Sequence, residues 1–251
     1  MIRAIVFDLD NTLLDFMRMK GDAVDAAILG MVDAGLDLPR EEIRARIDAI
    51  YQERGLEFQQ VFDVLLEREF GRIDPRILAS GIVAYRRARA SALSLYPHTQ
   101  MAILELVRRG IRLGVVSDAP RMQVWLRLCE VQLQHDFDAV VTFDDTGERK
   151  PGAAPFREVL RRLDVPPAEA LMVGDWAERD VVGGKGLGML TVFARYGDTF
   201  DTKESGADFD IDDIIELVRI VDRLNGRIGA PERGRQAADP PTTLDSGRGG
   251  H

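Results

Sequence analysis

The sequence is poor in cysteine and in long apolar runs. Its 251 residues include one cysteine, Cys129, and no apolar run approaches the roughly 18 residues that a membrane-spanning helix needs. A single cysteine excludes an internal disulfide, and the helical pattern WLRLCEV around it favours a packed thiol over a nucleophile. The N-terminus resembles a strand and carries no basic segment or cleavage site of a secretion signal. We therefore expect a cytoplasmic protein with no membrane partner.

Positive charge is also scarce. The formal net charge is -9, and the basic residues are mostly arginine, with lysine only at positions 20, 150, 185 and 203. Because a nucleic-acid backbone needs a concentrated basic surface, this balance argues against a nucleic-acid partner. A small phosphorylated metabolite remains a suitable partner if a metal ion and a few local cations offset the charge. Nothing in the sequence predicts the oligomeric state.

What the sequence does contain is a series of short apolar, β-branched runs. They lie at residues 2–7, 111–117, 138–143, 170–174 and 188–193, and from 111 onward they alternate with helical patterns. Apolar strands separated by helices are typical of a parallel sheet covered on both faces. We therefore predict an α/β fold with a doubly wound, Rossmann-like core, whose ligands bind at the carboxyl ends of the strands.

Residues 16–95 interrupt that alternation, because they show four apolar stripes at helical spacing and no convincing strand. The stripes are Val24, Ala27, Ile28, Met31 and Val32; Ile43, Ile47, Ile50 and Tyr51; Phe58, Val61, Phe62, Leu65 and Leu66; and Ile77, Leu78, Gly81, Ile82 and Tyr85. We predict an all-helical cap inserted into a core formed by residues 1–15 and 96–225. Residues 226–251 are rich in Gly and Pro and lack periodicity, which predicts a flexible tail.

Two aspartates follow the first apolar run, in the stretch FDLDNTLL. Side chains at positions i and i+2 of a strand point to the same side, so Asp8 and Asp10 can reach one ligand beyond the strand end. Such a pair is stable if a divalent cation offsets the repulsion or if one member is protonated. Either state suits nucleophilic and acid–base chemistry. A solvated turn is the alternative, because Asp and Asn favour turns.

Three later stretches place polar side chains at the same edge of the predicted sheet. Ser117 ends the run LGVVS, Lys150 precedes a predicted helix, and Asp175 follows the run LMVG, with Asp180 five residues later. A hydroxyl and a compact ammonium suit phosphate oxygens, and carboxylates from two strands suit Mg²⁺. Each residue alone is also common in turns and solvated loops, so the ordered set carries the interpretation.

Together these residues resemble the motifs of the haloacid dehalogenase superfamily of phosphohydrolases, in its branch with a helical cap after the first motif. The motifs occur in order and the resemblance covers the chain to about residue 225. They are Asp8-Leu9-Asp10-Asn11-Thr12, Ser117, Lys150-Pro151, and Gly174-Asp175 with Asp180. The resemblance implies a Mg²⁺-dependent phosphatase that forms an aspartyl phosphate.

The resemblance also implies roles for the three aspartates that end the first and fourth predicted strands. Asp8 would be the nucleophile, and Asp10 the general acid and base. Asp8, Asp175 and the backbone carbonyl of Asp10 would bind Mg²⁺.

Four further residues would hold or support the phosphate. Ser117 and Lys150 would bind it, and Thr12 and Asp180 would act in support. Trp176 departs from the family pattern, which often has Ser or Thr there, and this bears on the hydrogen bonds beside the metal site.

Other chemistry remains on the same scaffold. A dehalogenase does not need an acid of the Asp10 type, so the presence of Asp10 favours hydrolysis of a phosphate monoester. A phosphomutase would keep both aspartates, so they do not exclude it. A phosphonatase would need a cap lysine for a Schiff base, and the candidate, Lys20, is expected on a polar helix face. A catalytically silent binding protein is the alternative from a different class.

The substrate would be a small phosphorylated metabolite, because the branch resembled includes phosphosugar and triose-phosphate phosphatases. In capped members the inserted helices largely determine specificity. The segment YQERGLEF, residues 51–58, lies between two predicted helices and is the candidate to face the site, with Gln52, Arg54 and Phe58 as possible contacts.

Overall fold

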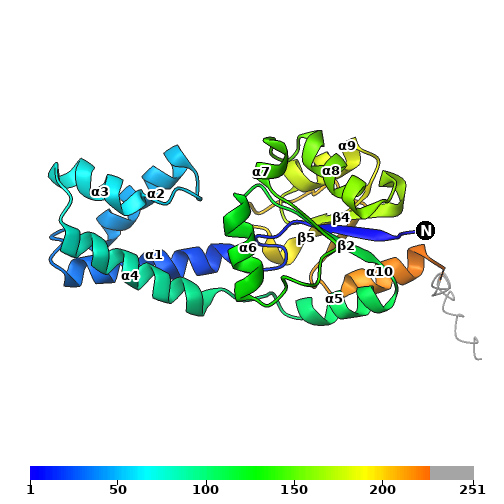
Figure 1. Ribbon diagram of the computed structural model, residues 1–251, viewed down its shortest axis with the longest axis horizontal. Coiled ribbons are helices and arrows are strands. Elements are labelled where there is room, and N and C mark those ends of the chain that lie inside the picture. The colour runs from blue at the N-terminus through cyan, green and yellow to red at the C-terminus, as the bar shows by residue number, and fades with distance from the viewer. Residues whose placement is uncertain (227–251) are drawn as a thin grey trace, which may run out of the picture.

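The computed structural model describes residues 1–226, in which a helix-covered sheet is joined to an elongated module of four helices (Figure 1). The strands are β1 (Ala4–Phe7), β2 (Arg112–Val116), β3 (Ala139–Val141), β4 (Ala170–Gly174), β5 (Leu190–Ala194) and β6 (Phe209–Ile211). The helices are α1 (Phe16–Asp33), α2 (Arg40–Arg54), α3 (Val61–Phe70), α4 (Pro75–Ala92), α5 (Thr99–Arg108), α6 (Arg121–Glu130), α7 (Phe143–Thr146), α8 (Ala153–Leu163), α9 (Val182–Gly186) and α10 (Glu216–Leu224). The tail predicted over residues 226–251 lies, beyond Gly226, outside the described residues.

The six strands form one parallel sheet in the order β3-β2-β1-β4-β5-β6. This confirms the predicted doubly wound α/β fold, and β1 lies between β2 and β4 near the centre of the sheet. β6 was not predicted, because it is only three residues long and lies in the acidic stretch ADFDIDD, which has no apolar run.

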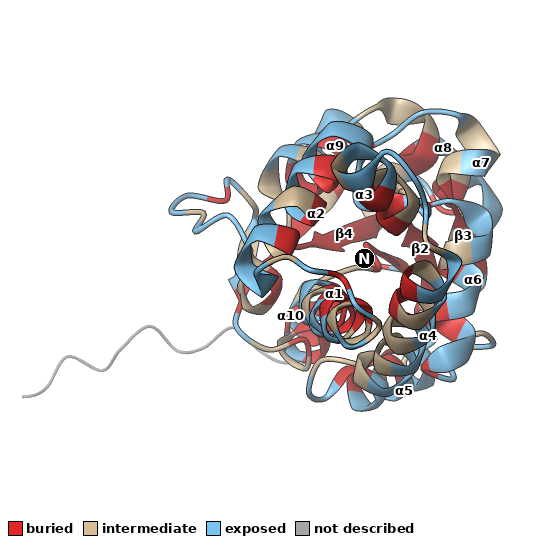
Figure 2. Cartoon of the chain, turned by 90° about the vertical axis from the view of Figure 1, so that its left-hand side faces the viewer, coloured by how far each residue is buried: buried red, intermediate tan, exposed pale blue. Residues whose placement is uncertain are grey.

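Both faces of the sheet are buried under helices. Along β1, Ile5 and Phe7 point into the apolar cluster under α5, α6 and α10, while Ala4 and Val6 point into the cluster under α8. Figure 2 shows the strands as buried elements at the centre of the molecule. The expectation of a packed thiol was wrong, because Cys129 lies on the exposed side of α6.

The helical module, α1 to α4, has an apolar cluster of its own. Its buried and partly buried members include the side chains of all four stripes recognised in the sequence. α1 runs outward from the sheet and α4 returns beside it (Figure 1). Glycines allow the close approach, since a Cβ on Gly30 would lie 2.9 Å from the Ser80 carbonyl oxygen and one on Gly81 would lie 2.7 Å from Met31. Within residues 1–226, no helix combines the length and apolarity needed to cross a membrane.

The chain enters and leaves the helical module at adjacent points. Leu14 and Leu95 form an antiparallel bridge, the Asp15 amide donates to the Ser94 carbonyl at 3.1 Å, and the Tyr96 amide donates to the Leu13 carbonyl at 3.0 Å. The module is therefore attached directly after β1, beside the carboxyl ends of the strands.

Candidate active site

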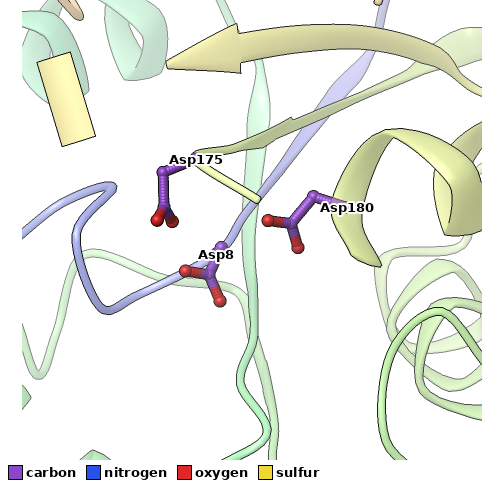
Figure 3. A group of neighbouring side chains, drawn as sticks. All are labelled: Asp8, Asp175 and Asp180. Carbon is purple, nitrogen blue, oxygen red and sulfur yellow. The ribbon is translucent and has the colours of Figure 1, made fainter. Parts of the chain in front are cut away.

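Five of the residues singled out in the sequence are buried at the carboxyl edge of the sheet. Asp8 follows β1, Ser117 follows β2 and Asp175 follows β4, while Lys150 lies in the loop before α8 and Asp180 in the π-helical turn Ala177–Val181. Figure 3 shows the carboxylates of Asp8, Asp175 and Asp180 gathered around one space. Parallel strands end at the same edge, which explains how residues so far apart in the sequence come together.

Lys150 connects the loop before α8 to this group of acids. Its Nζ contacts the Asp8 carboxylate and donates to Asp180 Oδ1 at 2.7 Å. Burial lowers the pKa of Lys150, but the carboxylates of Asp180, Asp8 and Asp118 outweigh it and raise the pKa above its ordinary value. Lys150 is therefore a fixed positive charge beside Asp8.

The three carboxylates form a group that fits a divalent cation. One oxygen from each of Asp8, Asp175 and Asp180 lies within 4.8 Å of the others. Burial and then repulsion by Asp8 and Asp180 raise the pKa of Asp175, so the ionised form is costly without a cation. Thr12 Oγ1 lies 3.0 Å from Asp175 Oδ1 and 3.5 Å from Asp8 Oδ2. Carboxylate oxygens are the ligands that Mg²⁺ prefers, so the donor set suits this ion.

Asp180 differs from the other two acids because an N–H group of the protein donates to each of its carboxylate oxygens. Oδ1 accepts from Lys150, and Oδ2 accepts from the Trp176 amide at 3.1 Å. A Cβ on Gly174 would lie 2.2 Å from Asp180 Oδ2, so only glycine at the end of β4 leaves room for this carboxylate. Asp180 is thus arranged to hold Lys150 and the loop after β4.

Asp10 lies outside the three-acid group and has a different partner. Its Oδ2 accepts from Arg127 at 2.6 Å, while its Oδ1 is buried with no hydrogen-bond partner among the described residues. Burial is the main cause that raises the pKa of Asp10 to about 7; Arg127 lowers it and Asp8 raises it. A carboxyl with a pKa near neutrality can both give and take a proton, as acid–base catalysis requires.

Ser117 and Asp118, which follow β2, form hydrogen bonds within their own loop and with two neighbouring segments. The Ser117 hydroxyl oxygen accepts from the Ala119 amide at 3.2 Å, which leaves its proton as a donor. Asp118 accepts from the Lys150 amide at 2.9 Å and from Arg179 at 3.0 Å. Asp118 therefore positions both the lysine loop and the loop after β4, a role that sequence reasoning did not predict.

Trp176, the departure from the family pattern, packs its ring against Arg179 and Phe200. The Arg179 guanidinium lies 3.6 Å from the centroid of its ring, and the Phe200 ring lies 4.4 Å away. The Trp176 backbone contacts the site, because its amide donates to Asp180 Oδ2 and its carbonyl accepts from the Asp180 amide at 2.8 Å. The backbone makes this contact, so no hydroxyl side chain is needed for it.

The helical module contacts the site through a residue that was not predicted. Within the segment 51–58, Glu57 binds Arg127. Contact of Gln52, Arg54 or Phe58 with a leaving group stays a prediction. Arg127 itself lies on the buried face of α6, three residues after Val124 and one before Leu128. An arginine at an apolar position of a helical stripe was the signal that could have identified it.

Lys20 was also misplaced by sequence reasoning. It is buried instead of lying on a polar face, and its Nζ donates to the Leu56 carbonyl at 2.9 Å and to the Tyr85 hydroxyl at 3.1 Å. Its position four residues before Val24 places it on the apolar stripe of α1, which was the overlooked signal.

Comparison with known proteins decides the family. A family model described as haloacid dehalogenase-like hydrolase matches residues 2–188. The chain belongs to the haloacid dehalogenase-like hydrolases. These comparisons confirm the resemblance, the fold class and the prediction of a phosphoric monoester hydrolase.

Two curated relatives and one solved structure illustrate the similarity. The chain is 34% identical over 227 residues to the glyceraldehyde 3-phosphate phosphatase of Methanocaldococcus jannaschii, covering 89% of this chain and 99% of the relative. It is 33% identical to the enzyme of the same name from Methanothermobacter thermautotrophicus, covering 88% and 100%. The structure of a phosphatase of this family from Thermococcus onnurineus is 27% identical, with a TM-score of 0.66 and coverage of 88% and 98%.

Proposed function

We propose that this hydrolase is a Mg²⁺-dependent phosphatase of small phosphorylated metabolites, with triose phosphates as the first substrate class to test. The observation that carries the proposal is the buried group in which Lys150 contacts Asp8 and Asp180 while Asp175 stands opposite. A nucleophile, a fixed cation and a metal-binding acid pair are what transfer of a phosphoryl group requires.

In the first step an Asp8 oxygen attacks phosphorus, and the bond from phosphorus to the leaving oxygen breaks. Lys150 and the Ser117 hydroxyl hold the phosphate oxygens, and Lys150 also keeps the Asp8 carboxylate in place. Asp10 gives a proton to the leaving oxygen, so the product departs as a neutral alcohol. The result is an aspartyl phosphate on Asp8.

In the second step Asp10 takes a proton from water, and the water oxygen attacks the phosphorus of the aspartyl phosphate. The bond from phosphorus to the Asp8 oxygen breaks, which releases phosphate and restores the Asp8 carboxylate. The pKa of Asp10, raised to about 7 mainly by burial, supports both directions of proton transfer.

Asp8, Asp175 and the backbone carbonyl of Asp10 would hold Mg²⁺. When bound, the ion offsets the charge of the acids and of the phosphate, so that nucleophile and substrate can approach each other. Thr12 and Asp180 support this arrangement by positioning Asp175 and Lys150.

We assign the role of cap to the helical module, residues 16–95, and the role of catalytic core to residues 1–15 and 96–225. The position of Glu57 beside Arg127 and Asp10 supports this division, because it brings the module over the carboxyl edge of the sheet. The names of the two archaeal relatives support a triose phosphate as substrate.

The test is a screen of phosphorylated metabolites that includes glyceraldehyde 3-phosphate, with phosphate release measured in Mg²⁺ and in EDTA. We expect Mg²⁺-dependent release, fastest for triose phosphates. Full activity in chelator would refute the metal site, and absence of release from every phosphate ester would refute the phosphatase.

The burial of Lys20 keeps a phosphonatase as a second candidate. Burial is the largest of the causes that lower the pKa of Lys20 to about 8, and a lysine with a lowered pKa is suited to a Schiff base. Borohydride should trap the enzyme in the presence of a carbonyl phosphonate if this chemistry occurs. We expect no trapping, because Nζ is already bonded to the Leu56 carbonyl and the Tyr85 hydroxyl.

A further inference from the structure

Arg127 forms one ion pair with a carboxylate of the α/β part and another with a carboxylate of the helical module. Its guanidinium donates to Asp10 Oδ2 at 2.6 Å and to the Glu57 carboxylate, and only 3% of its side chain is exposed. It also lies over the ring of Phe16, the first residue of α1, with 4.3 Å between Cζ and the ring centroid. Figure 1 shows α6, which carries Arg127, on the side of the sheet that faces the module. The Arg127 side chain therefore contacts the proposed acid, the first residue of α1, and the segment of the module between α2 and α3.

Glu57 is held by the packing of the module. The neighbouring Leu56 carbonyl accepts from Lys20, which also donates to Tyr85 of α4 and lies 4.2 Å from the ring centroid of Tyr51 in α2. A buried ammonium thus fixes this segment to three helices at once. The position of Glu57 relative to Arg127 consequently follows the position of the whole module.

The two ion pairs depend on each other. A buried guanidinium is costly unless its charge and its N–H groups are matched, and here two carboxylates share it. If the module were displaced, Glu57 would leave and Arg127 would keep Asp10 as its remaining partner. The orientation of Asp10 would then change, and displacement of a catalytic group by about 1 Å can cost about 10²-fold in rate.

We propose that Arg127 is a positioning residue, which orients the Asp10 carboxylate for proton transfer when Glu57 brings the helical module over the site. The proposal rests on the proposed function, in which Asp10 is the acid. It adds a link between the module and the chemical step that is separate from substrate contacts.

The test compares a substrate with a poor leaving group, glyceraldehyde 3-phosphate, with an aryl phosphate whose phenolate leaves with little help. Arg127→Met keeps the aliphatic stem and removes the guanidinium. We expect kcat for the triose phosphate to fall about 10²-fold and kcat for the aryl phosphate less than about 10-fold. KM should change little for both, because Ser117 and Lys150 hold the phosphate.

Three matched variants separate the link from general stability. Glu57→Gln should also lower the ratio of kcat for the triose phosphate to kcat for the aryl phosphate. Combined with Arg127→Met it should add little, because both substitutions remove the same interaction. Arg127→Lys keeps the charge but replaces the planar guanidinium, whose two terminal nitrogens each bind one carboxylate, with a single ammonium nitrogen, so it should not restore the ratio. Arg3→Met is the control: it breaks the 2.8 Å ion pair with Glu169 at the amino end of β1, opposite the carboxyl edge where Asp10 lies, and should leave the ratio unchanged.

Each outcome decides the matter. Equal slowing of both substrates in Arg127→Met, full recovery of the ratio in Arg127→Lys, or additive effects of the Arg127 and Glu57 variants would overturn the inference. A wild-type enzyme that hydrolyses neither ester would overturn the proposed function as well, whereas an active enzyme with an unchanged ratio overturns this inference alone.

Discussion

The α/β part and the helical module use buried polar groups for different ends. At the carboxyl edge of the sheet, Asp8, Asp175 and Asp180 are gathered around one space that can receive a ligand. In the module, Lys20 is surrounded by its own helices and its donors are used within the protein. The first arrangement holds like charges close together, where a ligand can interact with them. The second fixes the relative positions of the helices in the module.

The largest test of this contrast is Asp8→Asn. The amide cannot form an acyl phosphate, so kcat should fall roughly 10⁴-fold or more, while the near-isosteric change leaves the fold intact. Steady-state phosphate release and circular dichroism measure the two effects. Substantial activity in the folded variant would remove Asp8 from the role of nucleophile.

Asp10→Asn should act selectively. Loss of a general acid costs about 10²- to 10⁴-fold, and this loss should appear with the triose phosphate far more than with an aryl phosphate. With the aryl ester, a burst followed by slow turnover is expected, because the same residue activates water in the second step. Single-turnover rates that fall equally for both esters would leave Asp10 as a structural residue.

Asp175→Ala should change the metal requirement more than the chemical step. We expect the Mg²⁺ concentration for half-maximal activity to rise at least about 10-fold, in line with the cost of losing groups around a metal. A Mg²⁺ titration of the variant beside wild type measures it. An unchanged titration curve would place the ion elsewhere.

Ionisation of the buried aspartates at the edge of the sheet should make the metal-free protein less stable as pH rises. The folded-state pKa values of Asp10 and Asp175 are raised above 3.8, so their contribution is fully present below about pH 4 and is lost as pH rises through the folded values. Lys150, whose pKa is raised, stays protonated and contributes to the free energy of unfolding throughout this range.

In EDTA, the free energy of unfolding should therefore fall by at least about 2 kcal/mol between about pH 5.5 and about pH 8. Urea unfolding measures this change. Mg²⁺ should reverse it by binding the ionised carboxylates, and Asp175→Asn should reduce it. A metal-free protein that gains stability over the same interval would contradict the pKa shifts.

The smallest effect is expected from Arg54→Ala in the helical module. Arg54 pairs with Glu53 at 3.2 Å and lies over Phe58, on the surface and apart from Arg127. The free energy of unfolding should change by less than about 0.5 kcal/mol, with kcat unchanged. A large effect on kcat would show that the wrong residue of segment 51–58 has been linked to the site.

The same contrast explains what could be predicted from the sequence. Strand runs and the polar residues that end them are local patterns, so the fold and the grouping of Asp8, Lys150 and Asp175 followed from the order of the motifs. The packing stripes of the helical module followed from their spacing.

The contacts across the two parts could not be predicted in this way. Arg127, Glu57 and Asp118 act through partners 32 to 117 residues distant in the sequence, and no local pattern encodes such pairs. Lys20 was misplaced because a charged residue on an apolar stripe was assumed to face solvent, whereas its long side chain finds oxygens inside the module.

The bridge between Leu14 and Leu95 has a consequence for how such enzymes diversify. Because the two ends of the inserted helices lie side by side, the α/β part meets the same short gap whatever the length of chain between them, and closing a longer loop costs only slightly more. Helices could therefore be lengthened, exchanged or recruited from elsewhere between residues 15 and 94 without moving a strand. The strand ends that group the acids can thus stay fixed while the inserted helices change, apart from the contact of Glu57 with Arg127 that links the two parts.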